Sequence, residues 1–237
     1  MKVEVLFPEI CSLYGELGNI RYLQQSCPDL EIIETDLKSR PAFLDQNVAL
    51  VYMGSATEEG LALAAEALRP FKSELAACID AGQRFLITGN AMDIFGKSIT
   101  SDDGFSMEGL GLFDMEVRYQ MLKRASSFFL GSCDGMEIVG FKSLFGYCYG
   151  AGLDEPFLQC LRGVGREPGA PVEGFRRKNF MATHLIGPLL VLNPPFSRRL
   201  LQEMGVEEVS LAYEDVAMAA YEKRLEEFRN ESISIHF

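Results

Sequence analysis

The stretch that decides the fold is Leu-Ile-Thr-Gly-Asn-Ala-Met-Asp-Ile-Phe-Gly, residues 86–96. It begins as an apolar run that is typical of a short buried strand. The run breaks at Gly89-Asn90, a pair that tolerates positive φ, and apolar residues then return at helical spacing through Met92 and Phe95. Strand, sharp turn and helix in this order predict a nucleophile elbow, whose apex carries the attacking side chain. Here the apex is Gly89, where Ser or Cys would be expected.

The pattern around this stretch alternates between strand and helix. Strands are expected at residues 2–7, 30–35, 47–52, 84–88 and 180–185, and helices at 20–26, 57–81 (interrupted near Pro70), 195–203 and 211–228. Short alternating strands are expected at 112–119, 127–130 and 136–141, and loops at 98–111 and 146–171, which are rich in turn-forming residues. This order predicts an α/β fold: a mostly parallel central sheet with helices on both faces, in a single domain of residues 1–237.

Composition limits the partners and the compartment. A net charge of −12 and a pI near 4.7 argue against nucleic acid and anionic membrane surfaces. No apolar run reaches the ~18 residues of a transmembrane helix, and the first residues do not resemble a signal peptide. The six cysteines form no CxxC pair and the chain has two histidines, so zinc fingers and ribbons are excluded. We expect a cytoplasmic protein with free cysteines, no metal and no cofactor.

Four blocks of sequence, taken in order, resemble one known family. The blocks are Leu-Tyr-Gly-Glu-Leu-Gly-Asn at 13–19, Tyr-Met-Gly-Ser at 52–55, the elbow at 86–96, and Glu-Gly at 173–174 followed by Ala-Thr-His-Leu-Ile-Gly-Pro-Leu-Leu at 182–190 and Asn-Pro at 193–194. Together they resemble the class I glutamine amidotransferases, in particular the CobB/CobQ-like branch, across nearly the whole chain. The resemblance implies a flavodoxin-like class I amidotransferase architecture, in agreement with the strand and helix pattern.

The chemistry of that family requires two side chains. A Cys thiolate attacks the amide carbonyl of glutamine, a His activates it, and two backbone N–H groups hold the oxyanion. The resemblance places the nucleophile position at Gly89 and the position of the base at Ile186. It also places Lys142 and Ser143 where relatives carry other polar residues. Both essential groups are therefore missing, and the sequence indicates a scaffold without its glutaminase chemistry.

Three neighbouring residues are weak substitutes for the missing groups. His184 lies two residues from Ile186, which on a strand means about 6.5–7 Å along the chain, too far without a change of register. Asp93 lies one turn into the elbow helix, where the helix dipole alone explains a carboxylate. Asn90 cannot supply a thiolate. A displaced cysteine such as Cys148, which falls in an expected loop, is more typically a small apolar filler.

The resemblance also assigns substrate contacts to Gly54, Ala91 and Arg124. Gly54 is the glycine that remains of the family's Gly-rich turn, and Ala91 lies within the elbow. The Arg124 guanidinium suits bidentate binding of a substrate carboxylate. A solvated charge at the end of a strand is the alternative interpretation of this arginine.

These observations support three functional hypotheses. The first is a catalytically inactive amidotransferase-like protein that binds a partner or a small ligand; the resemblance implies a Mur ligase-like synthetase subunit that acts on a peptidoglycan precursor. The second is an active amidotransferase or hydrolase that uses displaced groups and supplies ammonia to such a synthetase. The third is a sensor whose elbow pocket binds glutamine or another small amide.

Overall fold

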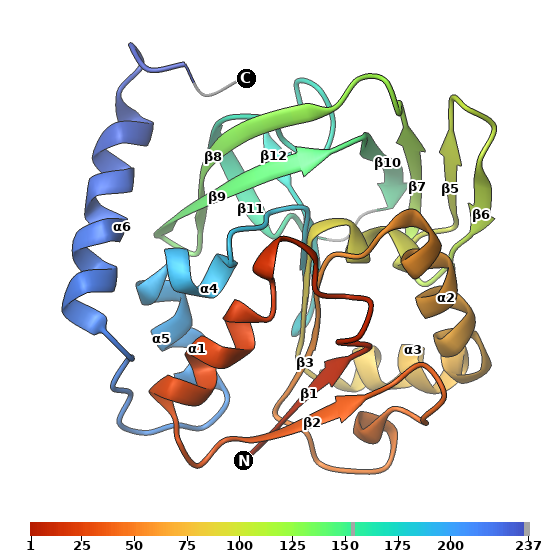
Figure 1. The fold of residues 1–237 in the computed structure, drawn as a ribbon, viewed down its shortest axis with the longest axis horizontal. Helices are drawn as coiled ribbons and strands as arrows, with labels where there is room; N and C mark the ends of the chain where they lie inside the picture. Colours follow the sequence, from red (N-terminus) through yellow and green to blue (C-terminus); the bar gives the residue numbers. More distant parts are fainter. Residues whose placement is uncertain (153–154, 235–237) are drawn as a thin grey trace.

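The computed structural model describes residues 1–152 and 155–234, and a six-stranded sheet lies at its centre (Figure 1). The strand order is β13-β14-β4-β3-β1-β2. The strands are β1 (Lys2–Leu6), β2 (Glu31–Thr35), β3 (Leu50–Met53), β4 (Phe85–Thr88), β13 (Phe175–Arg177) and β14 (Phe180–Thr183). All neighbours pair in parallel except β13 with β14, which are antiparallel. The prediction of a mostly parallel sheet is therefore confirmed.

Helices cover both faces of this sheet (Figure 1). One face carries α1 (Gly18–Ser26), α4 (Leu189–Leu192) and α5 (Pro194–Glu203), and the other carries α2 (Glu58–Leu68) and α3 (Lys72–Ala81). A turn of 3-10 helix, η3 (Arg69–Phe71), separates α2 from α3. It contains Pro70, which has no N–H to donate and would clash inside a continuous helix. Two further 3-10 turns are η1 (Leu13–Gly15) and η2 (Ala42–Leu44).

The alternation of side chains along a strand explains why both faces are apolar. On β3, Val51 and Met53 pack in the cluster that includes α2 and α3, while Leu50 and Tyr52 pack in the cluster that includes α1 and α5. All four side chains are fully buried. Successive residues of a strand point to opposite faces, so a continuous apolar run indicates a strand that is covered on both sides.

The second half of the chain forms two smaller sheets, which confirms the predicted change of sheet style. Their orders are β10-β7-β5-β6 and β12-β11-β8-β9. The strands are β5 (Ser98–Ser101), β6 (Ser106–Glu108), β7 (Asp114–Tyr119), β8 (Ala125–Cys133), β9 (Met136–Leu144), β10 (Gly146–Gly152), β11 (Leu158–Arg162) and β12 (Val172–Glu173). The last helix, α6 (Glu214–Arg229), packs against β8 and β9 (Figure 1).

Two predicted loops were wrong, because 98–111 contains β5 and β6, and 146–171 contains β10 and β11. The glycines that suggested a loop serve close strand packing instead. A Cβ on Gly146 would lie 2.4 Å from the Arg118 carbonyl oxygen, and one on Gly150 would lie 2.2 Å from the Asp114 carbonyl oxygen. Glycine inside a strand often marks such a close approach of two backbones.

The elbow helix is also shorter and tighter than the spacing predicted. It is a 3-10 helix, η4 (Gly89–Phe95). It ends because Gly96 is extended and the Phe95 carbonyl accepts hydrogen bonds from the backbone N–H groups of Leu112 and Phe113. After this end of the helix, the chain continues into β5. Among the described residues, no helix has both the length and the apolar character needed to cross a membrane.

Candidate functional site

A buried glutamate joins the two segments to which the sequence resemblance assigned the catalytic groups. Glu16 has no exposed surface. Its Oε1 accepts a hydrogen bond from the Gly187 N–H at 3.2 Å, and its Oε2 accepts from the Thr88 hydroxyl and, at 3.2 Å, from the Tyr52 hydroxyl. Thr88 precedes Gly89, and Gly187 follows Ile186. The block at residues 13–19 therefore acts here as a structural brace.

The Glu16 carboxyl group predicts a pH-dependent contribution to stability. Burial raises its pKa above the ordinary value of 4.5, although the hydrogen bonds from Thr88, Gly187 and Tyr52 work in the opposite direction. A raised pKa gives stability that is fully present below pH 4.5 and is lost as the pH rises through the folded-state pKa. Glu16→Gln keeps the shape and has no proton to lose. We therefore expect its unfolding free energy, relative to wild type, to rise as the pH increases above 4.5 in urea titrations; a difference that is independent of pH would contradict this account.

The space for a nucleophile above Gly89 is already filled. Gly89 has a φ of +62°, as an elbow apex requires. A Cβ built there would lie 1.7 Å from Ser55 Oγ, 3.0 Å from Ser55 Cβ and 3.1 Å from Ile186 Cγ2. Ser55 and Ile186 are both buried. A side chain at Gly89 would therefore find no free space, because Ser55 and Ile186 already occupy it.

A small cavity of about 140 Å³ adjoins the elbow. It is lined by Ser55, Gly89, Asn90, Asp93, His184 and Ile186, among others. The lining includes neither Gly54 nor Ala91, two of the positions that the family resemblance assigned to substrate, although their chain neighbours contribute to it. The Ser55 hydroxyl is buried and has no hydrogen-bond partner among the described residues.

Arg124 lies beside this cavity, not inside it. Its side chain is exposed, and one terminal nitrogen donates to the Tyr14 hydroxyl at 3.2 Å. Its guanidinium also lies 5.4 Å from the centre of the Phe145 ring. Tyr14 and Phe145 both line the cavity. A guanidinium at this mouth can meet a carboxylate that projects from the cavity, so the assignment of Arg124 remains a prediction.

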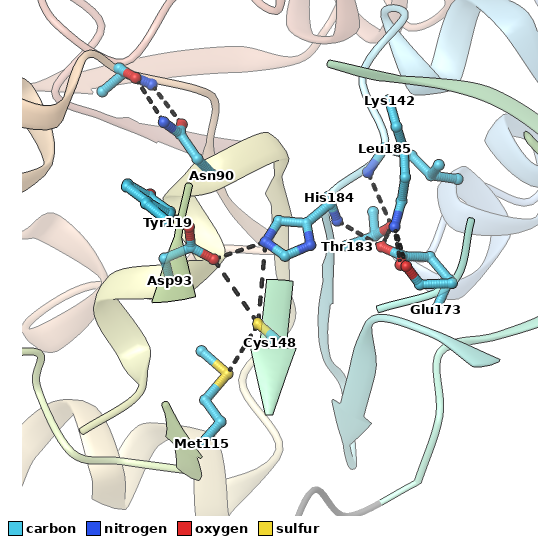
Figure 2. Close-up of polar contacts among 12 residues, drawn as sticks. Asn90, Asp93, Met115, Tyr119, Lys142, Cys148, Glu173, Thr183, His184 and Leu185 are labelled. Carbon is cyan, nitrogen blue, oxygen red and sulfur yellow. Dashed lines mark hydrogen bonds and ion pairs between the residues drawn. The ribbon is translucent and has the colours of Figure 1, made fainter. Parts of the chain in front are cut away.

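Asn90 serves to hold η4 against the loop that follows β3. Its side-chain amide donates to the Ala56 carbonyl at 2.8 Å and accepts from the Ala56 N–H at 3.0 Å (Figure 2). Both hydrogen-bonding ends of the side chain are therefore engaged by backbone. This arrangement explains the residue without a role in chemistry.

Asp93 and His184 meet at the floor of the cavity, together with a cysteine from a distant strand (Figure 2). The distances are 2.7 Å from Asp93 Oδ1 to His184 Nε2, 3.9 Å from the same oxygen to Cys148 Sγ, and 4.0 Å from Cys148 Sγ to His184 Nε2. Tyr119 donates to Asp93 Oδ2 at 2.7 Å. All four side chains are buried. The loop predicted for Cys148 was wrong, since it lies in β10.

This cluster does not have the geometry of a catalytic triad. In a triad the carboxylate and the nucleophile contact opposite nitrogens of the imidazole. Here Asp93 and Cys148 both approach Nε2 of His184, and Nδ1 has no partner among the described residues. Burial, reinforced by the Asp93 charge, raises the pKa of the Cys148 thiol well above 9.0. A neutral thiol is a poor nucleophile.

A fully buried ion pair supports the segment that carries His184. Lys142 Nζ contacts Glu173 Oε2 and donates to the Gly165 carbonyl at 2.8 Å. Glu173 Oε1 accepts from the His184 N–H at 2.8 Å and from the Thr183 hydroxyl at 3.0 Å (Figure 2). Burial by itself would raise the pKa of Glu173, but the Lys142 charge brings it below 4.5. The sequence pattern gave no sign of this pairing, because 31 residues separate the two partners.

Comparison with known proteins agrees with this architecture. Residues 2–192 match the model of the CobB/CobQ-like glutamine amidotransferase domain. The chain is 25% identical over 195 residues to lipid II isoglutaminyl synthase (glutamine-hydrolyzing) subunit GatD of Staphylococcus aureus (strain N315), covering 81% of this chain and 79% of that one. A crystal structure of a glutamine amidotransferase is similar with a TM-score of 0.55 at 15% identity, covering 86% and 99% of the two chains. PurLQS from Thermotoga maritima is similar with a TM-score of 0.54 at 11% identity, covering 86% and 96%; these two structures show the fold.

Proposed function

The chain belongs to the CobB/CobQ-like glutamine amidotransferase family, and on that premise we propose that it is a member that has lost the glutaminase reaction and acts by binding. The observation that carries the proposal is the filled space above Gly89, where a Cβ would lie 1.7 Å from Ser55 Oγ. Ile186 at the position of the base adds a second loss. Removal of the nucleophile or base of a triad can cost on the order of 10⁶ in turnover, and the rest of the site retains roughly 10³–10⁴ over water.

The proposed partner is a Mur ligase-like synthetase subunit that acts on a peptidoglycan precursor. The support is the similarity to a subunit of lipid II isoglutaminyl synthase, which spans 81% of this chain. Leu13 and Tyr14 line the cavity and remain 36% and 50% exposed. Apolar side chains at the mouth of a cavity are suited to cover by a second protein.

An amidation assay with the co-purified synthetase tests this function. We expect the complex to amidate the precursor when an ammonium salt is supplied and to fail when glutamine is the only nitrogen source, because ammonia is not released. Product is measured by mass spectrometry. Glutamine-dependent amidation by the same complex would overturn the loss of glutaminase, and the absence of a stable complex would overturn the proposed partner.

The second candidate is a hydrolase that uses displaced groups. The observation in its favour is the meeting of Asp93, His184 and Cys148 beside the cavity. It is weakened by the contact of both partners with one imidazole nitrogen and by the raised pKa of the thiol. Binding of glutamine or another small amide is a further alternative, for which the unpartnered Ser55 hydroxyl offers a hydrogen bond.

A further inference from the structure

The cluster at the cavity floor brings together three kinds of metal-binding atom. A carboxylate oxygen of Asp93, the thiol sulfur of Cys148 and Nε2 of His184 all lie within 4.8 Å of one another. The three residues come from η4, from β10 and from the position just after β14. Regular elements therefore carry two of the donors, and the third directly follows a strand. Their separation along the chain explains why no ligand spacing is visible in the sequence.

The donor atoms have the chemistry of a zinc site, and their separations are close to those of one. Zn²⁺ binds thiolate at about 2.3 Å and imidazole or carboxylate at about 2.0–2.2 Å, so the donors of a tetrahedral site lie about 3.3–3.7 Å apart. The separations here are 2.7, 3.9 and 4.0 Å. Shifts of about half an ångström would bring all three into that range. We propose that Asp93, Cys148 and His184 bind Zn²⁺ or a similar divalent transition metal ion, with the fourth position facing the cavity.

The charge balance of the three ligands favours a divalent cation at this buried site. One dication with a carboxylate, a thiolate and a neutral imidazole sums to zero, which reduces the cost of burying the ion. Binding releases the thiol proton of Cys148 to solvent, since a metal-bound thiol is deprotonated. The neighbouring Lys142–Glu173 pair is balanced within itself. Two further charged groups of opposite sign lie nearby: Arg166 acts on the Cys148 thiol, and Glu58 lines the cavity.

The cavity supplies the open side of the site. Asp93 and His184 line it, so an ion held by them would meet the cavity at its remaining position. Three protein ligands with one open position are typical of catalytic zinc sites, in which water is the fourth ligand. The unpartnered Ser55 hydroxyl faces the same cavity and could hydrogen-bond such a water.

The imidazole also sets an expectation for affinity. With the ion on Nε2, the proton of His184 lies on Nδ1, which has no acceptor among the described residues. Loss of such an outer hydrogen bond typically weakens metal binding by 10–100-fold. We therefore expect binding that is reversible by a chelator and weaker than that of closed structural sites.

The test is a titration of the tag-free, metal-free full-length protein with Co²⁺, followed by Zn²⁺. We expect one equivalent of Co²⁺ to produce a near-ultraviolet thiolate-to-cobalt absorption band, which Zn²⁺ then abolishes. Cys148→Ser should lose the band. Cys11→Ser is the matched control, since Cys11 is also a free and fully buried cysteine, and it should retain the band.

A second measurement guards against a variant that fails to fold. Zn²⁺ should raise the melting temperature of wild type and of Cys11→Ser. His184→Asn removes a different proposed ligand and serves if Cys148→Ser does not fold; its melting temperature should not rise with Zn²⁺. The absence of a cobalt–thiolate band in the wild-type protein overturns the proposal. A band that survives in Cys148→Ser assigns the metal to another cysteine and also overturns it. None of these outcomes depends on whether glutamine is hydrolysed.

Discussion

Replacing Gly89 with cysteine is expected to lower the free energy of unfolding by about 2–4 kcal/mol and to create no glutaminase activity. Part of the loss comes from the positive φ of +62°, and the larger part comes from overlap of the new Cβ with Ser55 and Ile186. Rotation of the Ser55 hydroxyl relieves only the closest contact, since Ser55 Cβ would still lie at 3.0 Å. Urea unfolding measures the loss, and release of ammonia from glutamine measures the activity.

Gly135→Cys is the matched control for this substitution. Gly135 has a φ of +83° and nothing lies within 4 Å of its Cβ position, so it isolates the backbone strain, about 1 kcal/mol. Adding Ser55→Gly to Gly89→Cys should recover part of the stability, because it removes the atom at 1.7 Å. Equal losses for the Gly89 and Gly135 variants would show that the space above Gly89 is not filled.

Lys142→Met is expected to destabilise the protein by about 3–5 kcal/mol at neutral pH, because it leaves the buried Glu173 carboxylate without its countercharge. Both side chains are at most 1% exposed. In wild type, the lowered pKa of Glu173 gives stability that is present above pH 4.5 and is lost as the pH falls through the folded-state value. In the variant, burial without a partner raises that pKa, so its stability is lost as the pH rises. Urea titrations at neutral and mildly acidic pH measure both effects.

The double variant Lys142→Met/Glu173→Gln separates the lost charge from lost packing. The amide oxygen of glutamine can still accept from the His184 N–H and the Thr183 hydroxyl, the two bonds that Glu173 Oε1 makes. We expect the double variant to be more stable than Lys142→Met alone at neutral pH, and its own stability no longer depends on pH through this group. If the double variant is less stable than the single one, the account of an uncompensated charge is wrong.

The sequence predicted those elements that depend on a local signal, such as a continuous apolar run or a proline. The parallel strands around 47–52 and 84–88 followed from continuous apolar runs, and the break near Pro70 followed from the chemistry of proline. The resemblance assigned the two catalytic positions to Gly89 and Ile186, and the structure brings both segments to Glu16, which bonds to the next residue in each, Thr88 and Gly187. These features depend on residues close in sequence or on a recognisable block.

Features made by distant residues could not be predicted in this way. The strands in 98–111 and 146–171 depend on pairing across sheets, and glycines that permit close approach resemble glycines that permit turns. The filling of the elbow by Ser55 depends on two loops meeting in space. The contact of Cys148 with His184 joins two residues that lie 36 positions apart in the chain. The two-residue separation of His184 from Ile186 was the reason to reject His184 as a substitute, but it gives no information about distant contacts such as Cys148.

The most direct measurement for the central claim is hydrolysis of glutamine labelled with ¹⁵N in its side-chain amide. The purified protein, at high concentration and with and without the synthetase, is followed by NMR for labelled ammonium. The account predicts no release above the rate without protein. Release that scales with protein concentration and disappears in Cys148→Ser or His184→Asn would contradict it and would establish a relocated active site.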